Sequence, residues 1–171
     1  MSWAHLAKRF ATSLWPGGPP NSDEVWVASI LSSREQVLWE RMSGADRRHA
    51  VGVARRVEVA LGDEATTPIL AAALLHDVGK VASGLGTYGR VVATLAGKVA
   101  GPQMAPAWSK GGGITRRTGL YLRHGELGAE MLEVAGADPL TSTWAREHHH
   151  PEADWSLPLH VASALKAADD D

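Results

Sequence analysis

Cysteine is absent from the 171 residues of this sequence. Disulfide bridges, cysteine-ligated metal sites and a cysteine nucleophile are therefore excluded. An apolar run of about 18 residues, the length that a membrane-spanning helix needs, is also missing. The longest candidate, residues 91–105, is interrupted by Lys98, two glycines and Pro102. The first ten residues, MSWAHLAKRF, lack the apolar centre of a signal peptide, so we expect a cytoplasmic protein with no transmembrane segment.

Neither sign of charge dominates. Seventeen Lys and Arg side chains stand against nineteen Asp and Glu, which gives a net charge of -2. A basic tail or long charge run is missing, so we expect no stable binding to nucleic acid. Hydrophobic residues make up 44% and charged residues 21%, which is typical of globular proteins, and the length fits one domain.

Capping residues predict where several helices begin. Ser32 and Ser33, with Glu35 and Gln36 three residues later, form two overlapping capping boxes, so a helix should run from there to about Met42.

Two further helices follow from the same kind of signal. The next should be capped by Asp46 and end at Leu61, because Gly62 follows. Thr67-Pro68 predicts the start of another, which is apolar nearly all round and should be the buried centre of the fold, ending at Gly79.

Further helices are predicted at 3–15, 87–100, 114–123, 125–135, 139–149 and from about 158 to the C-terminus. No alternating strand pattern accompanies them, so the sequence predicts an all-α protein with at least five helices. We expect an N-terminal segment, 1–31, with a Pro/Gly turn at 16–20, followed by a helical domain over 32–171.

Histidine and aspartate recur on the inward stripes or ends of these helices. His49 precedes Val53 and Val57 on its apolar stripe, and Asp169 lies four residues after Leu165. The residues that share this placement are His49, His76, Asp77, His124, His148 and Asp169. Burying such groups costs several kcal/mol unless they are compensated, and one divalent cation compensates several at once. This set therefore predicts a metal site able to activate water for attack on phosphorus.

The order of these residues resembles the HD-domain superfamily of metal-dependent phosphohydrolases, over residues 46–171. HDVGK (76–80) looks like the HDxGK form of the family motif. HGELGAEML (124–132) and the paired histidine near 148 are similar to HD-GYP proteins, and ALKAADD (164–170) looks like the helix that supplies the last Asp. The chain also resembles small actinobacterial HD proteins.

The resemblance implies a role for each matching residue. A first cation would be bound by His49, His76, Asp77 and Asp169. Asp77 would bridge to a second cation held by His124, His148 and His149. Lys80 would contact phosphate or help to protonate the leaving group. The cofactor would be one or two Mn, Fe, Zn, Ni or Mg ions, and the substrate a nucleotide or other small phosphorylated metabolite.

The sequence also departs from the family pattern. After HHHPE comes ADWSLP, without a GYP triplet, so hydrolysis of a cyclic dinucleotide loses its best marker. An acidic pair of the kind expected in hydrolases of guanosine tetraphosphate is not evident either.

Several alternatives stay open. Arg47 and Arg48, near His49, can meet an anionic substrate or be solvated surface charge. The glycine-rich segment 110–117, with Arg116 and Arg117, can cradle a phosphate or be a flexible connector. His150 should be exposed, and Asp170 is the alternative to Asp169. The competing functions are a non-catalytic metal- or phosphate-binding regulatory module, a structural metal-stapled bundle, and a two-iron oxygenase.

Overall fold

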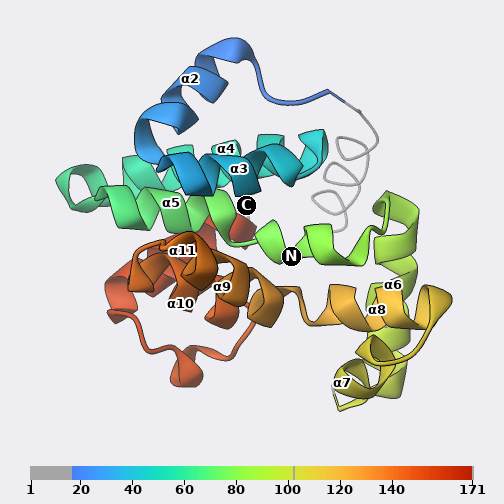
Figure 1. Ribbon diagram of the computed structural model, residues 1–171. Coiled ribbons are helices and arrows are strands. Elements are labelled where there is room, and N and C mark those ends of the chain that lie inside the picture. The colour runs from blue at the N-terminus through green and yellow to red at the C-terminus, as the bar shows by residue number, and fades with distance from the viewer. Residues whose placement is uncertain (1–16, 102, 171) are drawn as a thin grey trace.

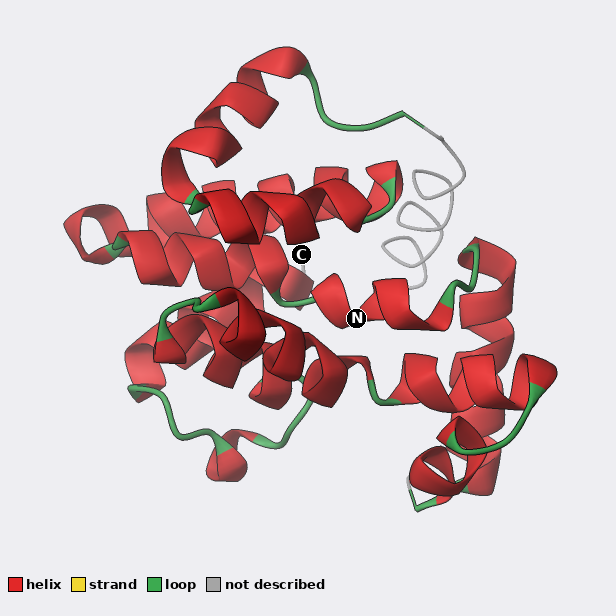
Figure 2. Ribbon diagram, in the orientation of Figure 1, coloured by secondary structure: helices red, strands yellow, loops and turns green. Residues whose placement is uncertain are grey.

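The structure is a computed structural model that describes residues 17–101 and 103–170. Within those residues the chain is helical and contains no strand, which confirms the predicted all-α class (Figure 2). The α-helices are α2 (Asn21–Ile30), α3 (Ser33–Arg41), α4 (Gly44–Leu61), α5 (Thr67–Leu75), α6 (Thr87–Ala100), α7 (Met104–Ser109), α8 (Gly113–Leu122), α9 (His124–Ala135), α10 (Pro139–Glu147) and α11 (Leu159–Asp170). The 3-10 helices are η1 (Gly62–Glu64), η2 (Val78–Ser83) and η3 (Glu152–Asp154).

The capping signals lie at or close to the helix starts, although α5 begins at Thr67 with Thr66 as its N-cap, one residue before the predicted cap. The capping box at the start of α3 is confirmed, since Ser32 Oγ accepts from Glu35 N and Glu35 Oε2 accepts from Ser32 N. Asp46 is the wrong cap for α4, because Ser43 lies three residues earlier and its hydroxyl accepts from Asp46 N at 3.1 Å. The helix therefore begins at Gly44.

The central helix, α5, is shorter than predicted. It ends at Leu75, and the tighter 3-10 helix η2 follows it, so the predicted end at Gly79 is wrong. Every residue from Ile69 to Leu75 is buried. This confirms that α5 is the centre of the fold, where it contacts α2, α4 and α10.

Two helices were not predicted, and one prediction cannot be compared. α7 is a short helix of six residues, and α2 falls within the expected N-terminal segment. α2 is tied to the rest of the core by the buried Val27 and by Trp39 Nε1, which donates to Glu24 at 2.8 Å. The predicted helix at 3–15 lies outside the described residues.

The helices form two groups joined by η2. α2–α5 and α9–α11 supply the core, while α6, α7 and α8 project to one side (Figure 1). In the part of the chain that the structure describes, no single helix is long and apolar enough to cross a membrane. Residues 67–83 and α6 meet that length and composition only as a pair, which is bent by 88°.

Candidate metal centre

At three helix ends in this fold, a histidine ring forms a hydrogen bond with a backbone carbonyl of the last turn. His76 follows α5, His124 follows the end of α8 and begins α9, and His148 follows α10. In each case Nδ1 lies 2.7–2.9 Å from the carbonyl oxygen three residues earlier. A carbonyl can only accept, so Nδ1 carries the proton and donates. These carbonyls lie in the last turn of a helix, where intrahelical donors run out.

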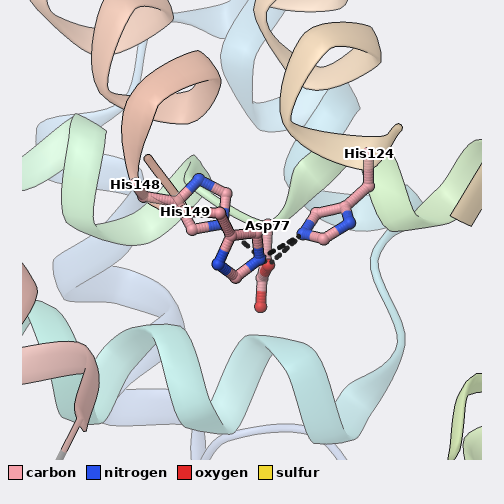
Figure 3. Close-up of side chains that lie close together, drawn as sticks. All are labelled: Asp77, His124, His148 and His149. Atoms are coloured by element: carbon pink, nitrogen blue, oxygen red, sulfur yellow. Dashed lines mark hydrogen bonds and ion pairs between the residues drawn. The ribbon is translucent and has the colours of Figure 1, made fainter. Parts of the chain in front are cut away.

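The fixed Nδ1 contacts aim the three Nε2 atoms at Asp77. Asp77 Oδ1 lies 3.3 Å from His124 Nε2 and 3.7 Å from His148 Nε2. Figure 3 draws these side chains, with dashed lines for the contacts between them. Asp77 Oδ2 lies 3.4 Å from His76 Nε2 and contacts Lys80 Nζ. The two oxygens of one buried carboxylate therefore face two different groups of ligands.

A second carboxylate completes the group around His76. Asp169, at the end of α11, has Oδ1 3.5 Å from His76 Nε2 and 2.9 Å from His49 Nε2. The bundle thus brings together residues 120 positions apart, as predicted. The alternative, Asp170, instead pairs with Lys166 at 2.8 Å on the outer face of the helix.

The other histidines that the structure describes lie at the edge of the cluster or away from it, and His5 is outside the described residues. His149 Nε2 lies 3.0 Å from His124 Nε2, so His149 stands at the mouth of the Asp77 group, with its residue surface exposed. His150 is exposed, which confirms the expectation. His160 is also exposed and lies 3.2 Å from Glu64.

Gly79 allows η2 to approach α9 closely. A Cβ at this position would lie 1.9 Å from the carbonyl oxygen of His124 and 2.6 Å from Gly128 N. Any side chain here would therefore push Asp77 away from His124. The glycine of HDVGK has a geometric role that the motif alone did not reveal.

Arg56 supports the other end of the site. From α4 it donates Nε and Nη2 to the carbonyl oxygen of Ala168, next to Asp169. Sequence reasoning missed this residue. Its signal was weak, because an arginine on a helix that also carries Arg55 reads as ordinary surface charge.

The electrostatics of the cluster favour ionised carboxylates. Burial alone would raise the pKa of Asp77, but the Lys80 ammonium and His76 outweigh it and hold that pKa well below its usual range. Burial likewise opposes ionisation of Asp169, while the hydrogen bond from His49 and the nearby His76 hold its pKa far below normal. Burial lowers the pKa of His76, but Asp77 and Asp169 outweigh this effect and raise it to about 10.

The donor set fits a divalent cation. Ligands about 2.1 Å from one ion, at tetrahedral or octahedral angles, lie roughly 3.0–3.4 Å from each other. The observed N···O distances of 3.3–3.7 Å around Asp77 are close to that spacing. His76 Nε2 and His148 Nε2 are buried without a hydrogen-bond partner among the described residues, which is costly unless a cation binds them. The cluster can therefore bind a metal ion.

The predicted substrate-binding residues are more scattered. Lys80 lies at the cluster, with its ammonium against Asp77 and its side chain 17% exposed. Arg48 is half-buried next to His49. Arg117 instead donates to the carbonyl oxygens of Ser83 and Gly84, where it holds the end of η2. Arg116 is exposed on α8.

Comparison with known proteins adds nothing to this picture, since no protein-family model, no curated protein and no solved structure matches the chain. Membership of the HD superfamily therefore stays a prediction that rests on the residues themselves.

Proposed function

We propose that this protein is a metal-dependent phosphohydrolase of the HD type, acting on a nucleotide or other small phosphorylated metabolite. The observation that supports this most directly is the shared orientation of His76, His124 and His148. Each donates Nδ1–H to a backbone carbonyl and turns Nε2 toward Asp77. A metal-binding histidine is typically oriented by such a contact to its second nitrogen.

Two cation positions that share Asp77 account for the division of its oxygens. One position would be bound by His49, His76, Asp77 and Asp169, the other by Asp77, His124, His148 and His149. Imidazole-rich sets with one or two carboxylates favour Mn, Fe, Ni or Zn over Mg. Two such cations, when bound, would supply neutralisation of phosphoryl charge and activation of a water molecule.

The protein's own residues supply the remaining requirements. Asp169 and Asp77 are held ionised, so both are ready as ligands at neutral pH. Asp77 outweighs the effect of burial and raises the pKa of Lys80, so this side chain keeps its charge. An ammonium at this place can bind a phosphate oxygen or donate a proton to the leaving oxygen.

The test is a hydrolysis screen of the purified full chain. Chelator-treated protein is supplied with Mn²⁺, Fe²⁺, Ni²⁺, Zn²⁺ or Mg²⁺ and offered nucleotides, cyclic nucleotides and sugar phosphates, with phosphate or nucleoside release as the readout. We expect release that Asp77→Asn abolishes and that Asp63→Asn, an exposed aspartate of η1, leaves unchanged.

Failure has a specific form. If the cations bind but no substrate is turned over, the protein is better explained as a non-catalytic phosphate-binding module than as an enzyme. If Asp77→Asn keeps full activity, any hydrolysis arises elsewhere.

A further inference from the structure

Helix α6 presents small residues to the rest of the protein. Ala93 is buried, and a Cβ on Gly97 would lie 2.7 Å from the Leu122 side chain of α8. These two residues let the helices pack closely. The inner face of α6 is therefore already covered by its packing against α8.

The outer face of α6 carries large aliphatic side chains that the protein leaves in water. Val91, Val92, Leu95 and Val99 are 44%, 65%, 58% and 91% exposed. Their spacing places them on one stripe, roughly 100° wide, which we call the α6 stripe. Elsewhere in the described chain, large exposed hydrophobic residues occur singly on their helices. With Tyr88, which is 68% exposed, α6 carries five of them, and a contiguous patch of this kind typically marks an interaction surface.

The charge around the α6 stripe has one sign. Residues 78–125 contain seven Lys and Arg side chains and no Asp or Glu, which leaves ten basic against nineteen acidic residues in the rest of the chain. The α6–α8 projection is therefore basic within a protein whose net charge is -2.

Three of these basic side chains are available to a partner. Lys80, Arg90 and Arg123 pair with carboxylates, and Arg117 binds backbone carbonyls. No described carboxylate forms an ion pair with the others, which are Lys98, Lys110 and Arg116.

We propose that the α6 stripe docks on the surface of an anionic lipid bilayer, with Lys98 of the same helix meeting the headgroups and the other basic side chains of the projection adding to the attraction. Exposed aliphatic residues flanked by lysine and arginine, without acidic residues, fit the boundary between acyl chains and anionic headgroups. A second copy of this chain fits less well, because it would bring two basic projections together. Nucleic acid would satisfy the charge but not the aliphatic stripe. The candidate metal ligands lie on other elements, so this proposal is independent of the hydrolase.

The test is co-sedimentation of the full chain with vesicles. We expect binding to vesicles that contain phosphatidylserine, little binding to phosphatidylcholine alone, and weakening as salt is raised. Lys98→Gln should weaken binding roughly fivefold, the contribution of one basic residue near an anionic surface. Val99→Glu should abolish binding, whereas Val59→Glu, at an 85% exposed position on α4, should change nothing.

Three results would overturn the proposal. They are no sedimentation with anionic vesicles, equal losses in Val99→Glu and Val59→Glu, and a dimer in light scattering that Val99→Glu dissociates. Binding to an oligonucleotide but not to vesicles would also reject it. Circular dichroism checks that each variant is folded, and Lys98→Gln provides the same comparison if Val99→Glu is not.

Discussion

Arg56 donates from Nε and Nη2 to a single acceptor, the carbonyl oxygen of Ala168, at 2.9 and 2.7 Å. This carbonyl belongs to the last turn of α11, where intrahelical donors are missing. The next residue is Asp169, so the guanidinium of Arg56 holds the helix end that carries a candidate metal ligand. The contact joins helices 112 residues apart in sequence.

Replacing Arg56 should therefore weaken metal binding without removing a ligand. We expect Arg56→Ala to lower the affinity for Mn²⁺ by about ten- to a hundredfold, as loss of a supporting contact commonly does. Arg56→Lys, with a single donor group, should be intermediate. Calorimetric titration measures both. Arg55→Ala is the control, because Arg55 packs on Trp26 and pairs away from the site. Equal affinities for Mn²⁺ in Arg56→Ala and the wild type would show that Arg56 does not support the metal site.

Gly79 and Gly86 differ in the space that the surrounding structure leaves for an added Cβ atom. A Cβ at Gly79 would overlap the backbone of α9, whereas one at Gly86 would have nothing within 4 Å. We expect Gly79→Ala to lower the free energy of unfolding by about 1–3 kcal/mol or more and to impair metal binding. Gly86→Ala should cost less, about 0.5–1 kcal/mol, because alanine is a poorer N-cap for α6 than glycine, and it should not affect metal binding. Thermal unfolding compares the two, and similar melting temperatures would show that η2 can move away from α9 at little cost.

The sequence allowed the class of fold and the order of the clustered residues to be predicted, because both depend on local signals. Capping residues and apolar periodicity marked most helices, and His49 and Asp169 lay on recognisable inward stripes. The features that could not be predicted depend on tertiary contacts. The side chain of Asp46 is suited to an N-cap, but Ser43 is the N-cap of α4. The contact of Arg56 and the clash at Gly79 depend on neighbours far away in the chain, which no local pattern encodes.

Lys80 should contribute to turnover rather than to metal content. We expect Lys80→Ala to lower kcat by roughly ten- to a thousandfold, because its ammonium would stabilise charge on the phosphoryl group. Bound metal, measured by elemental analysis, should not fall. Lys98→Ala, on α6, should keep normal kcat. A Lys80→Ala protein with wild-type turnover would show that the lysine merely neutralises Asp77.

The metal-stripped protein should lose stability at both ends of the pH scale. The pKa of His76 rises on folding from 6.5 to about 10, so its contribution is complete below pH 6.5 and is lost as pH rises through about 10. The pKa values of Asp77 and Asp169 fall on folding. Their contribution is present above their unfolded value of 3.8 and is lost as pH falls through the folded values.

Melting temperature measured against pH in chelator tests this directly. In His76→Asn the decline between pH 6.5 and 10 should be shallower than in the wild type. In the wild type, the rise in melting temperature on adding Zn²⁺ should grow with pH over that range, because the cation competes with the proton on His76. A metal-induced shift that does not change with pH would place the cation away from His76.

The most direct test of the central claim is the number of cations bound per chain. Chelator-treated protein is titrated with Mn²⁺ or Zn²⁺, and bound metal is counted by elemental analysis after dialysis. We expect two ions in the wild type, one in His148→Ala, none in Asp77→Ala, and two in the control His160→Ala, whose histidine is exposed and pairs with Glu64. A stoichiometry of one would reject the second cation site but would leave the proposed hydrolase function standing. Wild-type metal content in Asp77→Ala would contradict the metal centre itself.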